Sequence, residues 1–183
     1  MNLPNKITLV RIFLIPAFLF VYLAQPLAGV SETANLWLAL VLFAVAAITD
    51  ALDGYLARKL KLVTNFGKLM DPLADKLLVC SALIAFVASG NLPAWAVILL
   101  ISREFYITGL RQLAVEQNIV VAASMGGKLK TISQIVLIIY ILLPPPVNAL
   151  VFEPVVFAVL IVTVIVSVLT AVDYTFKNIS IFR

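Results

Sequence analysis

Long apolar runs separated by short polar breaks constrain this chain more than any other feature of its sequence. Of its 183 residues, 63% are hydrophobic and only 12% are charged, whereas a soluble domain needs roughly a quarter of its residues charged. A bilayer core about 30 Å thick takes roughly 20 apolar residues per helix. The sequence therefore predicts an all-α membrane protein and excludes an ordinary soluble domain.

Six transmembrane helices are expected, in a single membrane domain that covers residues 1–183. Turn-forming residues mark the breaks, among them the segment 64–67, the Gly126-Gly127 pair and the prolines at 144–146. The breaks delimit helices at about 7–24, 34–58, 70–89, 93–115, 125–143 and 151–176. The first stretch is similar to a secretory signal, but no clear small-x-small cleavage site follows it, so we expect it to remain in the protein.

The positive residues predict how these helices are oriented. All thirteen lie at the termini or near the connections that join the second helix to the third and the fourth to the fifth, and the connections near 25–34, 89–93 and 144–154 hold none. The positive-inside rule assigns the side rich in Lys and Arg to the cytoplasm. We therefore expect both termini to be cytoplasmic.

Four of the nine acidic residues fall within 26 positions, at Asp50, Asp53, Asp71 and Asp75. The first two are three residues apart and the last two are four apart, so each pair shares one face of a helix. Any one of them can be explained as a cap or as half of a salt bridge. Four carboxylates held close together, however, either take up protons or recruit cations.

The ligand types favour a hard divalent ion at these aspartates. The chain has no histidine, and its one cysteine, Cys80, cannot form an internal disulfide, so a zinc site and redox chemistry fit poorly. Carboxylate oxygens suit Mg²⁺ or Mn²⁺. Four carboxylates can hold two such ions, an arrangement that recurs in phosphoryl transfer.

Two glycines and an arginine lie among the aspartates. Gly54 follows Asp53 within the expected helix, where glycine costs about 1 kcal/mol relative to alanine, and Gly67 lies at the expected turn into the third helix. Both positions suit a close approach of the backbone to a ligand, although packing and turn geometry also explain them. Arg58 can bind a phosphate or extend to the membrane interface.

The segment from Asp50 to Asp75 resembles the signature of the CDP-alcohol phosphotransferases, D-x2-D-G-x2-A-R-x8-G-x3-D-x3-D, at every fixed position and every gap. The resemblance implies six transmembrane helices, a homodimer, and transfer of a CMP-activated group to an alcohol with release of CMP. It assigns the metal ions to Asp50, Asp53, Asp71 and Asp75, the cytidine nucleotide to Gly54, Ala57, Arg58 and Gly67, and the role of general base to Asp75.

Looser motifs resemble the branch of this family whose acceptor is glycerol 3-phosphate. They lie at residues 5–11, 103–105, 109–111 and 127–131. The branch implies CDP-diacylglycerol as the donor and a cationic acceptor site made by Arg103, Arg111 and Lys128, with Lys130 and Thr131 as weaker candidates and Asn5, Thr8 and Arg11 as the weakest. A rim for lipid headgroups is the alternative for these cations. Glu104 lies about 20° from Arg111 in helical projection, so an ion pair between these two residues is a second alternative.

The resemblance implies a bacterial enzyme of the cytoplasmic membrane, with its active site facing the cytoplasm. It would make phosphatidylglycerophosphate and CMP for anionic phospholipid synthesis, with membrane lipid around it and no nucleic-acid partner. A sibling enzyme that uses inositol phosphate, serine or phosphatidylglycerol as the acceptor is one alternative. A small cation transporter is another, but transporters place such sites near the midplane between repeats, whereas these aspartates lie at one end of their helices.

Overall fold

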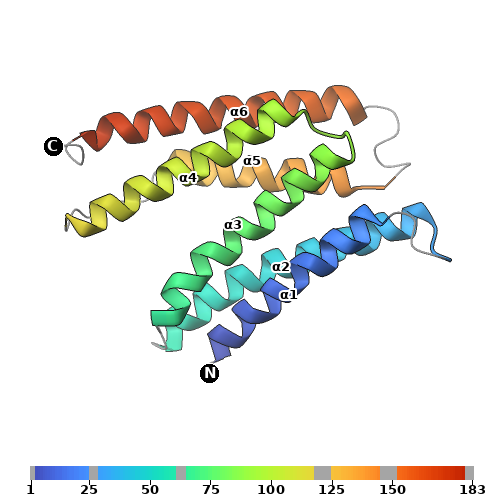
Figure 1. Ribbon diagram of the computed structural model, residues 1–183, viewed down its shortest axis with the longest axis horizontal. Coiled ribbons are helices and arrows are strands. Elements are labelled where there is room, and N and C mark those ends of the chain that lie inside the picture. The colour runs from blue at the N-terminus through green and yellow to red at the C-terminus, as the bar shows by residue number, and fades with distance from the viewer. Residues whose placement is uncertain (1–2, 25–28, 61–64, 118–124, 145–151, 180–183) are drawn as a thin grey trace. The chain divides into compact units, whose positions relative to one another are not determined.

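The described part of the chain folds into six α-helices in the computed structural model (Figure 1). The structure describes residues 3–24, 29–60, 65–117, 125–144 and 152–179, with side chains for 9–24, 29–49, 73–74, 76–117, 126–144 and 153–179. These ranges contain no strand, which confirms the all-helical prediction. The helices are α1 (Leu3–Leu23), α2 (Glu32–Leu60), α3 (Asn65–Ala88), α4 (Ala94–Glu116), α5 (Met125–Leu142) and α6 (Phe152–Lys177).

The helix boundaries follow the sequence prediction within about two residues, except that α1 begins at Leu3 rather than near residue 7 and α3 begins earlier than expected. This helix begins at Asn65, so Gly67 lies in its first turn and not in a turn before it. Residues typical of turns favour a break only weakly, so they can join a helix when the residues beside them are helical. Among the described residues, two segments are long and apolar enough to cross a membrane, Glu32–Thr49 of α2 and Glu153–Lys177 of α6. Six crossings with cytoplasmic termini stay a prediction.

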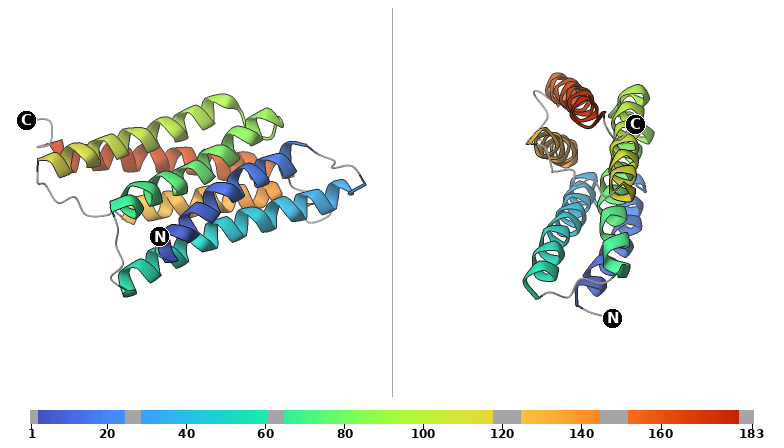
Figure 2. Two further views of the ribbon diagram at one scale, coloured as in Figure 1. Left: turned by 60° about the horizontal axis from the view of Figure 1, so that its bottom comes forward. Right: turned by 90° about the vertical axis from the view of Figure 1, so that its left-hand side faces the viewer.

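The chain divides into two compact units. The first contains α1, α2 and α3, and the second contains α4, nearly all of α5, and α6. Within the first unit, α1 and α2 run antiparallel and side by side (Figures 1 and 2). Within the second unit, α4 packs along α6 in the same direction. That both units form a single membrane domain stays a prediction.

Aromatic side chains hold the three helices of the first unit together. Phe18 of α1 packs against Tyr22 and against Phe43 of α2, with ring centroids 6.1 and 5.9 Å apart, and Tyr22 meets Phe86 of α3 edge-on at 5.2 Å. The Tyr22 hydroxyl is also 2.8 Å from Ser89 Oγ. Such aromatic pairs add stability beyond the area they bury, so this cluster fixes α2 and α3, which carry the signature.

Helix α3 ends in a Schellman motif. Gly90 adopts a left-handed backbone with φ of 78°, its N–H donates to the carbonyl of Val87, and the N–H of Asn91 donates to the carbonyl of Phe86. Glycine is the residue that accepts this conformation without a steric cost. The break expected near Gly90 is therefore the end of α3, and Pro93 follows as the N-cap of α4.

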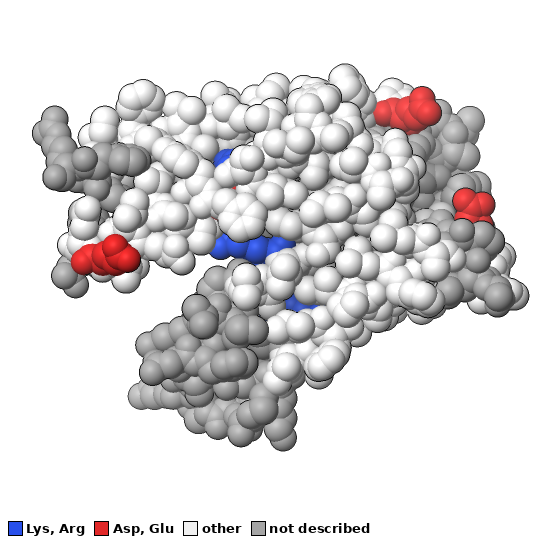
Figure 3. All heavy atoms as spheres, in the orientation of Figure 1, with Lys and Arg blue, Asp and Glu red and all other residues white. Residues whose placement is uncertain are grey.

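Large apolar side chains cover much of the described surface. Phe13, Phe20, Ile98, Phe105 and Phe176 each expose more than half of their area, and charged residues are sparse among the described atoms of the face in Figure 3. Exposed apolar surface on this scale marks contact with lipid or with another apolar partner. The outward faces of the helices thus support a membrane setting.

Candidate functional site

The four aspartates of the signature lie on α2 and α3. Asp50 and Asp53 are in the second half of α2, and Asp71 and Asp75 are in the first half of α3. The backbone is helical at all four positions, so the three- and four-residue spacings are helical spacings, as expected. Their side chains lie outside the described residues. Where side chains are described, no three His, Cys, Asp or Glu residues gather into a group, so the metal expectation rests on these aspartates.

The residues expected to hold the nucleotide share the same two helices. Gly54, Ala57 and Arg58 belong to α2, and Gly67 belongs to α3; their side-chain surroundings lie outside the described residues. The same holds for Asn5 and Thr8, which belong to α1. The side chain of Arg11 on α1 is described, and it is fully buried within the protein.

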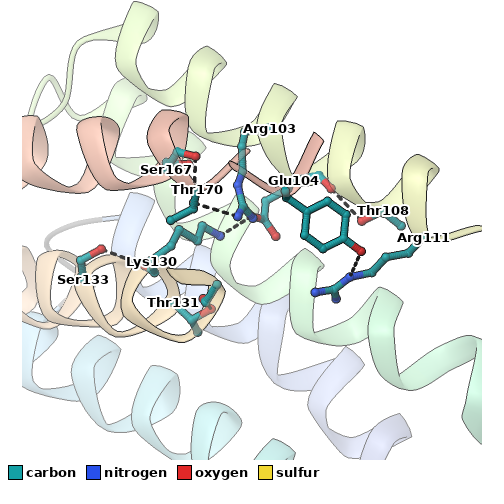
Figure 4. A network of polar contacts seen from close by, with 11 residues as sticks. Arg103, Glu104, Thr108, Arg111, Lys130, Thr131, Ser133, Ser167 and Thr170 are labelled. Atoms are coloured by element: carbon teal, nitrogen blue, oxygen red, sulfur yellow. Dashed lines mark hydrogen bonds and ion pairs between the residues drawn. The ribbon is translucent and has the colours of Figure 1, made fainter. Parts of the chain in front are cut away.

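A buried ionic cluster lies in the second unit, where α4, α5 and α6 meet (Figure 4). One carboxylate oxygen of Glu104, Oε1, accepts a hydrogen bond of 2.9 Å from Arg103 Nη1 and pairs with Lys130 Nζ from α5. The side chains of Arg103, Glu104 and Lys130 are 11%, 18% and 5% exposed. Arg103 Nη2 also donates to Thr170 Oγ1 of α6 at 3.1 Å. Two cations and one carboxylate leave the cluster with one net positive charge.

Glycine at position 126 lets α5 approach α6 beside this cluster. A Cβ atom at Gly126 would overlap the side chain of Thr170, the residue that accepts from Arg103. Glycine removes that overlap because it has no side chain. The Gly126-Gly127 pair, predicted as part of a break, belongs to α5. Gly126 therefore allows α5, which carries Lys130, to pack close to α6.

Arg111 lies two turns beyond Arg103 on α4 and is held by α6. Its Nε donates to the hydroxyl of the buried Tyr174 at 3.3 Å, and its guanidinium carbon lies 5.7 Å from the centre of the Tyr174 ring. The hydrogen bond and the cation–π contact together orient Arg111, whose side chain is otherwise exposed. The ion pair with Glu104 that helical spacing allowed is not among the described contacts, since Glu104 pairs with Arg103 and Lys130.

The two remaining acceptor candidates lie on the exposed face of α5. Lys128 and Thr131 are exposed, and the Thr131 hydroxyl donates to the carbonyl of Gly127 at 3.1 Å. The structure thus brings Arg103 and Lys130 together through Glu104. It leaves Arg111, Lys128 and Thr131 accessible on the same unit.

Several buried side-chain donors of this unit have no hydrogen-bond partner among the described residues. They are Arg103 Nε, Gln134 Nε2 and Ser167 Oγ. Gln134 follows Lys130 by one turn of α5, and Ser167 precedes Thr170 by one turn of α6. A buried donor without a partner carries a free-energy cost of about 1–3 kcal/mol. These unpartnered donors lie on the same three helices as the ionic cluster.

Sequence reasoning missed the contribution of α6 to this cluster. Thr170 and Tyr174 hold Arg103 and Arg111, yet both lie in a segment that otherwise consists of plain apolar helix. One signal was available, since polar residues recur along one stripe of α6 at Thr163, Ser167, Thr170 and Tyr174, all buried or partly buried. Such a stripe in an apolar helix indicates a face turned toward other helices.

Comparison with known families identifies the class of protein that carries these features. The family model described as CDP-alcohol phosphatidyltransferase matches residues 1–171. This chain therefore belongs to the CDP-alcohol phosphatidyltransferase family, and it is a phosphotransferase enzyme.

The relatives narrow the comparison to one branch. A protein of Bacillus subtilis called CDP-diacylglycerol–glycerol-3-phosphate 3-phosphatidyltransferase is 48% identical over 183 residues, which is 97% of this chain and 95% of the relative. A probable phosphatidylglycerophosphate synthase of Mycobacterium tuberculosis is 43% identical over 94% of this chain and 79% of its own length. A Mycoplasma pneumoniae protein with the same name as the Bacillus relative is 39% identical over 75% of this chain and 66% of its own length.

Proposed function

We propose that the protein transfers the phosphatidyl group of CDP-diacylglycerol to sn-glycerol 3-phosphate, giving phosphatidylglycerophosphate and CMP. The names of the relatives support this activity. The structural observation that carries it is the cationic set on α4 and α5, with Arg103 and Lys130 buried and Arg111 and Lys128 accessible. A phosphorylated acceptor is a dianion, and it needs such charges, whereas serine does not.

Asp50, Asp53, Asp71 and Asp75 would hold the metal ions. The donor chemistry fits, because these residues offer only carboxylate oxygens and the chain has no histidine, which favours Mg²⁺ or Mn²⁺. Four carboxylates supply enough ligands for two such ions. When bound, such ions neutralise negative charge on a diphosphate. Within the CDP-alcohol signature, Gly54, Ala57, Arg58 and Gly67 would bind the nucleotide of CDP-diacylglycerol.

The chain's own groups would then carry out the transfer. Asp75 takes the proton from the primary hydroxyl of glycerol 3-phosphate as that oxygen attacks the phosphorus bearing the diacylglycerol group. The bond from this phosphorus to the CMP oxygen breaks, and CMP leaves with the electron pair. Arg111, Lys128 and the buried cluster of Arg103 and Lys130 hold the acceptor phosphate. No covalent intermediate on the enzyme is needed.

The membrane topology belongs to the same proposal. Six crossings with both termini in the cytoplasm put the second half of α2, the start of α3 and the start of α5 at the cytoplasmic face. The positive residues support this orientation, and the exposed apolar side chains support contact with lipid. A donor with acyl chains and a water-soluble head suits such a position in the bacterial cytoplasmic membrane. As the family resemblance implies, the protein would act as a homodimer.

An acceptor panel tests this function. The purified protein is given CDP-diacylglycerol with glycerol 3-phosphate, serine, inositol phosphate or phosphatidylglycerol, each with Mg²⁺ or Mn²⁺, and CMP release is measured. We expect release with glycerol 3-phosphate and only background release with the other three. Faster turnover with any other acceptor would contradict the proposal and assign the protein to a sibling branch.

A further inference from the structure

We propose that Glu104 is the positioning residue of the acceptor site, holding Arg103 and Lys130 where the phosphate of the acceptor meets them. This inference rests on the proposed function, since it concerns the same acceptor. Glu104 Oε1 pairs with Arg103 Nη1 of its own helix and with Lys130 Nζ of α5.

Helical spacing alone does not create this arrangement. Arg103 and Glu104 are adjacent on α4, and adjacent residues of a helix point about 100° apart and do not face each other. Their contact therefore depends on groups that come from other helices. Lys130 draws the carboxylate from the side of α5, and Thr170 accepts from the second guanidinium nitrogen of Arg103 from the side of α6 (Figure 4).

Burial makes this carboxylate necessary for the two cations. The side chains of Arg103 and Lys130 are 11% and 5% exposed, so water does little to screen their mutual repulsion. The carboxylate oxygen that they share offsets this repulsion, so the guanidinium of Arg103 and the ammonium of Lys130 can lie close together.

The same geometry gives two opposite expectations for removing the charge of Glu104. If Glu104 only neutralises its neighbours, then Glu104→Gln raises the local positive potential and strengthens binding of an anionic acceptor. If it positions them, the two cations separate and binding weakens. Because the phosphate contacts depend on fixed geometry, the positioning role predicts the second outcome.

Steady-state kinetics of the full-length protein in detergent-lipid micelles separate these outcomes. For Glu104→Gln we expect the KM for glycerol 3-phosphate to rise about tenfold, with the KM for CDP-diacylglycerol within about twofold of wild type. The matched control is Asp173→Asn, which removes the carboxylate of an exposed ion pair with Lys177 on α6 and should leave both constants unchanged. An unchanged or lowered KM for glycerol 3-phosphate in Glu104→Gln would overturn the proposal.

Glu104→Asp provides a second arm that does not depend on how the neutral variant folds. Aspartate keeps the charge but is one methylene shorter, so we expect it to lose contact with Arg103 or with Lys130. We expect a rise in the KM for glycerol 3-phosphate here too, whereas a mere counter-ion would leave it at the wild-type value.

A double variant then shows whether Glu104 acts through Lys130. Glu104→Gln combined with Lys130→Met should raise the KM for glycerol 3-phosphate by clearly less than the product of the two single-variant effects, because the part of the Glu104 effect that acts through Lys130 is already lost in Lys130→Met. Additive effects would contradict the proposal. Failure of the proposed function is distinct from all of these results, since the wild-type protein would then show no turnover with glycerol 3-phosphate.

Discussion

At the scale of single residues, the signature aspartates carry the strongest prediction. Replacing Asp50, Asp53 or Asp71 with alanine should lower turnover at least about a hundredfold, because each change removes a carboxylate ligand of the proposed ions. The variants should still insert into membranes, since the aromatic contacts among Phe18, Tyr22 and Phe86 are untouched.

The measurement is CMP release with Mg²⁺ or Mn²⁺ and with a chelator in excess. Turnover should vanish in the chelator and return when the ion is restored. Wild-type activity in the chelator would show that the four aspartates do not act through bound metal ions.

Residue types were predictable at this scale, but their partners were not. Motifs that resemble the branch using glycerol 3-phosphate singled out Arg103 and Arg111, with Lys130 as a weaker candidate. The sequence did not predict that Glu104 pairs with Lys130, or that Tyr174 holds Arg111. Those contacts depend on how α4, α5 and α6 rotate against one another, and the periodicity of a uniformly apolar helix specifies that rotation poorly.

At the scale of helices, the approach of α5 to α6 depends on Gly126. Gly126→Ala places a methyl group against the stiff, β-branched Thr170 and should destabilise the protein by about 1–3 kcal/mol. Because Thr170 accepts from Arg103, the KM for glycerol 3-phosphate should rise as well.

Gly109→Ala is the matched control for this change. Gly109 lies within α4, and a Cβ there meets nothing within 4 Å, so alanine should be neutral or stabilise the helix by up to about 1 kcal/mol. Thermal unfolding in micelles compares the two variants. Equal shifts of the unfolding temperature would show that Gly126 does not govern the approach of α5 to α6.

Helix limits were largely predictable because the breaks contain residues with specific backbone demands. Gly90 and Pro93 end α3 and begin α4 as their chemistry requires. The prediction was wrong at Asn65 to Gly67, where residues typical of turns form the first turn of α3. Local preferences of that size are easily outweighed once a helix is packed against its neighbours.

At the scale of the whole molecule, the proposed reaction draws on residues of both compact units. The first unit carries the CDP-alcohol signature on α2 and α3, and the second carries the cations on α4 and α5. Composition alone predicted an all-helical membrane protein. It does not predict a division into two units, because that depends on which apolar faces pair, and every helix here is apolar on several sides.

If the cations of α4 and α5 bind the acceptor phosphate, varying the two substrates separately should reveal it. Steady-state rates are measured for wild type, Arg103→Gln, Arg111→Gln and Lys128→Gln, with Lys177→Gln as a control that removes an exposed cation of α6. Each of the three variants loses a charge-assisted contact worth roughly 1.5–3 kcal/mol. The KM for glycerol 3-phosphate should therefore rise about tenfold or more, with the KM for CDP-diacylglycerol little changed. Small and equal changes in the KM values of both substrates would instead assign these residues to a rim for lipid headgroups.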